Sequence, residues 1–499
     1  MTEPSAPRDP FPVAPPPADA ADDLPRRDFL RLATLGAGAV LAGAAPLALE
    51  AQERPTFPVR TGRGRRAGPT MHVVVVGGGV WGVNIARHLR KAGHRVTVIE
   101  QYGIANSRAT SGDETRGIRS SYGDRTITPE LWVSWARESI KRWREFDAEH
   151  GKRFGTRFFY TTGDLLMRQA PENFSSKSRE LWDKLGVRYE VLDEAEVRKR
   201  WPQIDASDHQ VLLYEPDAGV ARARDSVQAM ATLARDEGVE FRVGRAAPGP
   251  IAGGRMRQVS LPDGTVVTGD AFVFATGPWM HKTLPDVMGN RTLRPLGHVV
   301  YFGTPVDDAR FTYPNIPTWN VPGVTGWAAL PADSYGFRVR GSLRAPTPPN
   351  TGQPAGGAAP GAPAGAAPPP PPPPAAANPA DTDPDLSSRW TTERQIDGSR
   401  NVLRRYFPAM AEAPVLATRA CHYEISVNRN FIVDRIPGAE NAWITGQGQA
   451  EGFKFSIVIG EYAAWRVMGD AGDPALAEAF KYPTNEYPAN ARPFGGGDE

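Results

Sequence analysis

A glycine-rich run followed by an acidic residue is the clearest chemical pattern in the chain. Residues 77–82 read Gly-Gly-Gly-Val-Trp-Gly, and Glu100 follows in the same segment. Gly77 permits a tight turn, Gly79 lets the backbone approach a pyrophosphate, and Gly82 lets a helix pack closely on a strand. Phosphate charge would then lie at a helix N-terminus, where free N–H groups favour an anion. Glu100 is placed to accept hydrogen bonds from a ribose, which disfavours the ribose 2′-phosphate of NADP.

The segments around this run must position it. Residues 71–76 are apolar and β-branched, which predicts a buried parallel strand. Residues 83–92 predict a helix that ends at Gly93, and residues 95–99 predict a second strand. A complete strand–helix–strand unit is more specific than glycines alone, whose other interpretation is a loop of an unrelated α/β protein. We therefore predict a dinucleotide site, and the motif alone does not separate NAD from FAD. Its predicted contacts are Gly77, Gly79, Val80, Trp81, Gly82 and Glu100.

The chain of 499 residues has one cysteine, Cys421. A single thiol cannot form an intrachain disulfide. Three interpretations follow, which are a small buried hydrophobe, the partner in an intermolecular bond, and a covalent attachment point for a cofactor.

The first 52 residues read as a disordered N-terminus followed by a targeting segment. Arg26-Arg27-Asp28-Phe29-Leu30 precedes a weakly apolar stretch that is rich in Gly and Ala. The paired arginines resemble a twin-arginine signal, and the alternatives are an ordinary secretory signal and a hydrophobic N-terminal helix. We expect export by the twin-arginine route to the periplasm or another extracytoplasmic compartment. Residues 53–69 read as a basic linker.

Bulk composition argues against other classes of protein. A net charge of +2 gives no basis for nucleic-acid binding, and no segment after residue 50 is apolar enough for a membrane span. No pattern predicts a metal site. Residues 345–384 are rich in Pro, Ala and Gly and lack a hydrophobic pattern, so we expect a disordered surface insertion without a catalytic role.

Five further motifs follow the strand–helix–strand unit in a specific order. They are Glu114-Thr115-Arg116-Gly117-Ile118-Arg119, Glu215-Pro216-Asp217-Ala218-Gly219-Val220, Phe274-Ala275-Thr276-Gly277-Pro278-Trp279, Cys421-His422-Tyr423 and Gly452-Phe453-Lys454-Phe455-Ser456. In these motifs the chain resembles the flavin-dependent amine oxidases of the sarcosine oxidase and N-methyltryptophan oxidase type, in the D-amino-acid oxidase superfamily. The resemblance covers roughly residues 71–344 and 385–495.

The resemblance implies an enzyme that binds FAD and oxidises the C–N bond of an amino acid or a secondary (N-methyl) amine with a carboxylate. A hydride would pass from the carbon beside the nitrogen to the flavin, and water would hydrolyse the resulting imine. Arg119 and Lys454 would hold the substrate carboxylate, Tyr423 would line the pocket, and Cys421 would carry a covalent flavin link. Further implied FAD contacts are Thr110, Ser111, Thr115, Arg116, Gly452 and Phe453.

Several of these residues also have a plainer interpretation. Arg116 and Arg119 could be surface arginines. Lys454 lies between Phe453 and Phe455, so it could be a strand residue that points to solvent instead of a buried ligand-binding lysine.

Three departures from the family pattern bear on the reaction. The lysine that family oxidases place over the flavin corresponds to Arg338, which keeps the charge but cannot release a proton. The pocket and loop histidines correspond to Ser342, Ser111 and Gly112, so we expect a substrate other than sarcosine itself. The loop that ends at Glu451 is longer than the family loop and adds an acid near the flavin.

These departures keep two rival functions open. One is an FAD-dependent dehydrogenase that passes electrons to an acceptor other than oxygen, as Arg338 in place of lysine suggests. The other is a non-catalytic flavin-binding protein, and the presence of both Arg119 and Lys454 argues against it.

The predicted fold class is α/β, with two discontinuous domains. A Rossmann-like FAD-binding domain would take residues 70–157, 213–289 and 421–499, and an antiparallel-sheet substrate domain would take residues 158–212 and 290–420. A helix is expected near residues 129–147. We expect a monomer whose partners are a small amine or amino-acid substrate and oxygen or another electron acceptor.

Overall fold

The glycine-rich run follows the first strand of a six-stranded sheet. The computed structural model describes residues 69–331, 335–344, 382–470, 473–488 and 491, so the predictions for residues 1–68 and 345–381 lie outside the described residues. The order of the sheet is β23 (Ile432–Arg435), β24 (Ala442–Gly446), β15 (Ala271–Phe274), β1 (His72–Val76), β2 (Arg95–Glu100) and β9 (Glu240–Val243). Neighbouring strands are parallel except β23 and β24.

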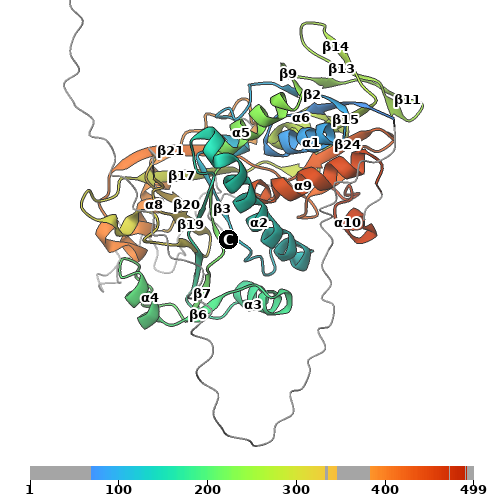
Figure 1. The fold of residues 1–499 in the computed structure, drawn as a ribbon. Helices are drawn as coiled ribbons and strands as arrows, with labels where there is room; N and C mark the ends of the chain where they lie inside the picture. Colours follow the sequence, from blue (N-terminus) through green and yellow to red (C-terminus); the bar gives the residue numbers. More distant parts are fainter. Residues whose placement is uncertain (1–68, 332–334, 345–381, 471–472, 489–490, 492–499) are drawn as a thin grey trace, which may run out of the picture. The chain divides into compact units, whose positions relative to one another are not determined.

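The predicted strand–helix–strand unit is present as β1, α1 (Val80–Lys91) and β2. Val73, Val74 and Val75 are fully buried, as expected for a parallel strand covered on both faces. Helix α1 packs against α9 (Gly452–Val467) and α5 (Ala223–Asp236), and the three helices lie close together in Figure 1. The chain's N-terminal unit therefore meets a helix from its C-terminal part.

A second, eight-stranded sheet is almost entirely antiparallel. Its order is β21 (Val415–His422), β17 (Leu296–Phe302), β20 (Phe337–Arg340), β19 (Val324–Trp327), β18 (Thr318–Val321), β5 (Asp164–Arg168), β7 (Val211–Glu215) and β6 (Glu190–Leu192). Only β18 and β5 pair in parallel among these described strands. The predicted α/β fold class, with a Rossmann-like sheet and an antiparallel sheet, is confirmed. The residue ranges of the two domains stay a prediction.

Smaller sheets complete the described part of the chain. A three-stranded antiparallel sheet joins β3 (Thr115–Ile118), β8 (Gly219–Arg222) and β4 (Phe159–Thr161). The remaining short strands are β10 (Ala247–Pro248), β11 (Ile251–Ala252), β12 (Arg255–Met256), β13 (Gln258–Ser260), β14 (Val266–Thr268), β16 (Thr292–Leu293) and β22 (Ile425–Ser426). The sheet of β3, β8 and β4 matters most here, because β3 carries the arginine motif.

Helix α2 (Pro129–Phe154) is longer than the helix expected near residues 129–147. His150 is buried beyond the expected end, and Gly155 ends the helix in the left-handed region at φ 62°. The other helices are α3 (Asn173–Leu185), α4 (Glu194–Arg200), α6 (Met280–Thr283), α7 (Pro285–Met288), α8 (Glu393–Tyr406) and α10 (Pro474–Ala479).

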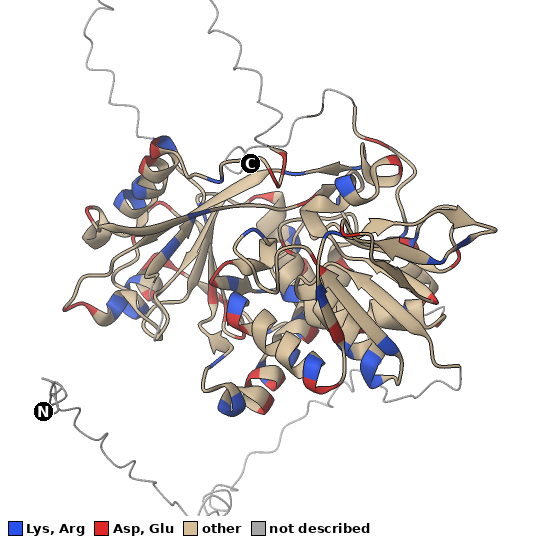
Figure 2. Cartoon of the chain, turned by 90° about the horizontal axis from the view of Figure 1, so that it is seen from above, with Lys and Arg blue, Asp and Glu red and all other residues tan. Residues whose placement is uncertain are grey.

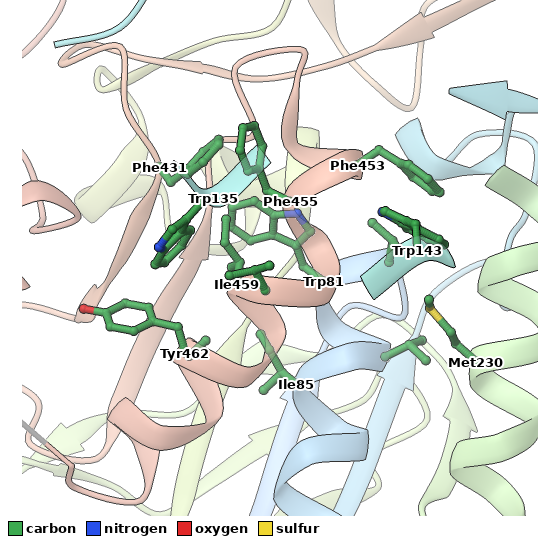
Figure 3. Close-up of a cluster of buried hydrophobic side chains, with 14 of the residues drawn as sticks. Trp81, Ile85, Trp135, Trp143, Met230, Phe431, Phe453, Phe455, Ile459 and Tyr462 are labelled. Carbon is green, nitrogen blue, oxygen red and sulfur yellow. The ribbon is translucent and has the colours of Figure 1, made fainter. Parts of the chain in front are cut away.

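Aromatic side chains from α1, α2 and α9, together with Phe431 just before β23, fill the core between these helices (Figure 3). The rings of Trp143 and Phe453 stack with centroids 5.2 Å apart, and Phe431 stacks on Trp132 at 4.4 Å. Large aromatic rings bury much apolar area and adopt specific pair geometries. The first turn of α9 is therefore packed against a rigid wall.

Residues of both charges are interspersed along the helices, strands and loops (Figure 2). This distribution agrees with the small net charge of +2. Within the described residues, no helix has the length and apolar content that a membrane span requires.

Candidate active site

A first cavity, of about 1090 Å³, opens at the carboxyl end of β1 and is bordered by the glycine-rich run. Gly77 adopts φ 106°, and a Cβ added there would lie 2.4 Å from the carbonyl oxygen of Ala275. A Cβ on Gly82 would lie 1.9 Å from the carbonyl oxygen of Gly77. Glycine is therefore required at both positions by close backbone approach.

Gly79 is different, because the space beside it is open. The nearest atom to a Cβ added at Gly79 is the Oγ of Ser111, at 3.7 Å. Gly79 precedes α1, so this space lies at a helix N-terminus, where unpaired N–H groups favour an anion. The residues present therefore fit a pyrophosphate.

Glu100 ends β2 beside the same cavity. Its Oε2 accepts a hydrogen bond from the Gly78 nitrogen at 2.7 Å, and its Oε1 accepts one from Tyr102 at 3.0 Å. Burial raises the pKa of Glu100, and these two hydrogen bonds oppose the shift. The side chain is thus held at the cavity wall, and its role toward a ribose stays a prediction.

A second cavity, of about 670 Å³, adjoins the first one. Residues that line both are Thr110, Arg116, Tyr423, Ala450 and Phe453. The second cavity lies over one face of the eight-stranded sheet, because side chains two apart on a strand share a face. The wall from this sheet consists of Gly297, Val299, Thr325, Trp327, Arg338, Arg340 and Cys421.

Asp113 is the shared partner of three arginines, of which Arg116 and Arg338 line the second cavity. It is fully buried and forms an ion pair with Arg116, while the guanidinium groups of Arg338 and Arg419 lie 3.6 and 3.7 Å from its carboxylate. The hydroxyl of Tyr301 donates to it at 3.0 Å. Burial opposes the charge of Asp113, but the three arginines hold its pKa below the usual range. Sequence reasoning missed Asp113, although it directly precedes the arginine motif.

Arg338 takes a stacked position in the second cavity. Its Cζ lies 4.0 Å from the ring centroid of Trp327, and the side chain is almost fully buried. Its Nε and Nη1 have no hydrogen-bond partner among the described residues. A guanidinium can stack on an indole and still present planar donors.

The two cations that were predicted to hold a carboxylate are brought together, and Glu451 joins them. Lys454 forms a close ion pair with Glu451, and Arg119 Nη2 lies 3.4 Å from Glu451 Oε1. Arg125 Nη1 lies 3.7 Å from the same oxygen. Burial lowers the pKa of Lys454 to about 8, and the neighbouring carboxylate of Glu451 opposes this shift. Burial alone would raise the pKa of Glu451. The nearby cations Lys454, Arg119 and Arg125 outweigh this effect and hold the pKa below the usual range.

Lys454 lies in the first turn of α9, so its interpretation as a strand residue that points to solvent is wrong. The side chain is only 2% exposed. Period-two alternation of Phe453, Lys454 and Phe455 was misleading because both faces of this helix turn are buried. The indole nitrogens of Trp81 and Trp143 donate to the carbonyl oxygens of Gly452 and Lys454, at 2.8 and 3.0 Å.

The loop before α9 holds three non-glycine residues in the left-handed region, which are Gln447, Gln449 and Ala450. Such residues persist only where surrounding contacts hold them. Glu424 is one such contact, because its Oε1 accepts from the Gly448 nitrogen at 2.9 Å. Glu424 also lines the first cavity, and burial raises its pKa. Sequence reasoning missed Glu424, although it directly follows the Cys-His-Tyr motif.

Cys421 lies on β21 opposite Gly297, is 9% exposed, and lines the second cavity. Tyr423 lines both cavities. The hydroxyl of Thr110 donates to the carbonyl oxygen of His422 at 2.6 Å, which ties the two segments together.

The remaining predicted contacts divide into two groups. Residues that line the first cavity are Gly77, Gly79, Val80, Trp81, Glu100, Thr110, Ser111, Arg116, Gly452 and Phe453. Thr115 lies behind the wall, because its hydroxyl accepts from Nε1 of Trp327 at 3.0 Å. Ser342, which was expected to correspond to the pocket histidine of the family, is hydrogen-bonded to His298 at 2.9 Å. Among the described residues, no group of three or more acidic, His or Cys side chains is arranged to hold a metal ion.

Sequence comparison gives two matches to family models. A model described as FAD dependent oxidoreductase (DAO) matches residues 72–466. A model described as the TAT signal of the ubiquitinol-cytochrome C reductase Fe-S subunit matches residues 16–55. The second match supports the twin-arginine signal.

Individual relatives agree with the first match. The chain is 24% identical over 404 residues to monomeric sarcosine oxidase of Streptomyces avermitilis, which covers 79% of this chain and 93% of that protein. It is 23% identical over 394 residues to N-methyl-L-tryptophan oxidase of Citrobacter koseri. That match covers 79% of this chain and 93% of that protein. Among solved structures, L-proline dehydrogenase from P. horikoshii superposes with a TM-score of 0.62 at 19% identity, over 83% of this chain and 97% of that chain. That likeness establishes the fold.

Proposed function

Because the chain belongs to the FAD dependent oxidoreductase (DAO) family and is an FAD-dependent oxidoreductase, we propose that it oxidises the C–N bond of a small amine that carries an acidic group. The substrate class is an amino acid or a secondary, N-methyl amine. The names of the two sequence relatives, a sarcosine oxidase and an N-methyl-L-tryptophan oxidase, support this class.

The observation that carries the proposal is the junction of the two cavities. Arg116, Tyr423 and Phe453 border both, so a group in the first cavity and a molecule in the second would meet there. FAD bound in the first cavity would supply a two-electron acceptor. The second cavity would hold the amine against it.

The chain's own residues would position the substrate and restrict water. Its wall is rich in cations, and planar guanidinium groups recognise a carboxylate at two points. Positioning of this kind accounts for much of the rate that an enzyme gains. Oxidation would remove a hydride from the carbon and a proton from the nitrogen, and water would then split the imine into a carbonyl compound and an amine.

A second candidate function differs from the first in the electron acceptor, and Arg338 supports it. Arg338 stands where family oxidases carry lysine, and its stacking on Trp327 holds a permanent charge that cannot release a proton. This arrangement favours a dehydrogenase that uses a carrier instead of oxygen.

One experiment tests both candidates. FAD-loaded protein is supplied with a panel of N-methyl amino acids and simple amino acids, and turnover is followed separately with an oxygen electrode and an artificial dye acceptor. Turnover with dye but little oxygen uptake supports the dehydrogenase, and efficient oxygen uptake supports the oxidase. Bound FAD without turnover by either route across the panel would contradict the proposed reaction and favour the non-catalytic flavin-binding protein.

We also propose that FAD is linked covalently through Cys421. The support is the position of Cys421 in the wall of the second cavity, two residues before Tyr423, which borders both cavities. Acid precipitation of the purified protein should leave a yellow pellet, and Cys421→Ala should give a colourless pellet and a yellow supernatant. A yellow supernatant from the unmodified protein would instead make Cys421 a buried structural thiol.

The site of action is proposed to be extracytoplasmic. The twin-arginine signal supports export, and that route carries proteins that fold and load a cofactor before transport. Fractionation of a producing cell should recover the activity outside the cytoplasm, and replacement of Arg26 and Arg27 by lysine should retain it inside.

A further inference from the structure

The two cations of α9 and β3 that were predicted to hold the substrate carboxylate already hold a carboxylate of this chain. Glu451 forms an ion pair with Lys454 and lies 3.4 Å from Arg119. Arg125 Nη1 also lies 3.7 Å from Glu451 Oε1. Arg119 and Lys454 are 8% and 2% exposed, so these charges are paired in a buried site and not on the surface.

The position of Glu451 is fixed by its loop. Gln449 Nε2 donates to Ser426 Oγ, Asn430 O and Gln447 O at 2.8, 2.9 and 3.0 Å. Gly448 is held by Glu424 at 2.9 Å. Since left-handed residues in this loop require such support, Glu451 is presented by a constrained segment.

Displacing Glu451 would therefore be unfavourable. An incoming carboxylate would have to break its contacts with Lys454 and Arg119 and leave a buried acid without a partner. Removing one member of a buried ion pair is strongly destabilising because the other charge stays buried. The Arg119–Lys454 pair is thus poorly suited to receive the acidic group of a substrate.

Of the two arginines on the sheet wall, Arg338 has its Nη2 3.6 Å from the carboxylate of Asp113, and neither contacts Glu451. Arg338 and Arg340 are two residues apart on β20, so their side chains share the face that lines the second cavity. Arg338 has Nε and Nη1 buried without hydrogen-bond partners among the described residues. Arg340 takes part in no ion pair within the described part of the chain, and its Cζ lies 5.8 Å from the ring centroid of Tyr423.

Arg340 lies between Val299 and Thr325 in the sheet register, which are short neighbours that also line the cavity. An anionic group above this row would meet the guanidinium of Arg340.

We propose that Glu451 is a built-in counterion that keeps the Arg119–Lys454 pair occupied, and that Arg340, with Arg338 beside it, receives the acidic group of the substrate on the sheet wall. This inference rests on the proposed function, because it takes the second cavity to be the substrate pocket. It makes Arg340 a determinant of specificity for acid-bearing amines.

Calorimetric titration of the FAD-loaded protein with propionate tests this assignment, with propionamide as an uncharged control of similar shape. Arg340→Gln should weaken propionate binding roughly 10- to 100-fold, the range for a hydrogen bond to a charged group. Arg119→Gln should change it by less than about threefold, the size of a weak long-range charge effect. Glu451→Gln should tighten binding or add a second site, because it frees Lys454.

Three results would overturn the assignment. They are propionate affinity unchanged in Arg340→Gln, affinity lost in Arg119→Gln, and binding that is seen only in Glu451→Gln. Thermal unfolding identifies a variant that has lost its fold. If Arg119→Gln does not fold, the propionate affinities of Arg340→Lys and Arg340→Gln are compared instead. Arg340→Lys keeps the charge, so it should recover part of the affinity that Arg340→Gln loses. Equal affinity in these two variants would also count against Arg340.

Failure of this inference differs from failure of the proposed function. Protein that holds FAD and oxidises amines, yet binds propionate independently of Arg340, would refute only the role of Arg340. Protein that holds no flavin would refute the proposed function, and calorimetry on the same full chain would still report whether Arg340 binds an acid.

Discussion

The indole nitrogen of Trp143 lies 3.0 Å from the carbonyl oxygen of Lys454. Trp143 belongs to α2 and Lys454 to the first turn of α9, so the bond ties the cation-bearing turn to a distant helix. Trp81 of α1 makes a similar bond to Gly452 at 2.8 Å. Two buried indoles thus fix the turn that borders both cavities.

Replacing Trp143 by Phe should remove this hydrogen bond while keeping an aromatic ring against Phe453. We expect the free energy of unfolding to fall by about 1 kcal/mol, the usual net value of such a bond. The matched control is Trp135→Phe, because Nε1 of Trp135 is buried without a hydrogen-bond partner among the described residues. Urea unfolding of both variants measures the difference, and equal losses would show that the bond to Lys454 contributes little.

Gly79 and Gly82 should respond differently to alanine. Gly82→Ala places a Cβ 1.9 Å from the Gly77 carbonyl oxygen, so we expect an unstable protein even before FAD is added. Gly79→Ala meets only Ser111 Oγ at 3.7 Å, so the apoprotein should fold normally and bind FAD at least about tenfold more weakly. Thermal unfolding of the apoproteins and FAD titration separate the two effects. Normal FAD affinity in Gly79→Ala would argue against a pyrophosphate beside Gly79.

Arg338→Lys should shift the balance of electron acceptors toward oxygen. Lysine is compact and can release a proton, whereas arginine keeps its charge. We expect the ratio of oxygen uptake to dye reduction to rise about tenfold, which corresponds to about 1.4 kcal/mol in barrier height. Arg168→Lys is a suitable control, because Arg168 is a buried arginine that stacks on Phe174 and lines neither cavity. An unchanged ratio in Arg338→Lys would mean that Arg338 does not set the acceptor.

Glu215 should make stability depend on pH. Burial raises the pKa of Glu215 to about 7 from an ordinary value of 4.5, although hydrogen bonds from the nitrogen and hydroxyl of Ser120 oppose the shift. As pH rises from 4.5 to 7, the unfolded chain loses this proton before the folded protein does. The folded protein therefore loses stability across this window, by on the order of 3 kcal/mol in total.

Glu215→Gln supplies the comparison, since it cannot titrate and keeps an oxygen that can accept from Ser120. The stability of the original protein relative to this variant should decline steadily between pH 4.5 and 7 and level off above. Urea unfolding at several pH values gives both curves. Parallel curves through this window would mean that Glu215 keeps an ordinary pKa.

The dinucleotide unit was predictable because its signals are local. Glycines at 77, 79 and 82, the flanking apolar runs and Glu100 all lie within a single strand–helix–strand segment. Backbone approach at these positions is dictated by short-range geometry, so the residue types alone carry the information.

The environment of the cations was not predictable in the same way. Asp113 meets Arg338 and Arg419 only because β3, β20 and β21 converge, and Arg119 meets Glu451 across 332 residues of sequence. Glu451 was recognised as an added acid, but its pairing depends on the left-handed loop before α9. Lys454 was ambiguous because alternation in three residues fits a strand and a fully buried helix turn equally well.

Glu451 belongs to the same chain as the cations that it neutralises, so any free acid competes with a tethered one. Groups joined by short flexible linkers act at effective concentrations in the mM range, and a constrained loop of matching length raises this further. Glu451 precedes Lys454 by three residues and is held by such a loop. Small organic acids dissolved around the protein therefore compete poorly for Arg119 and Lys454, and a change in their concentration leaves this part of the site as it was.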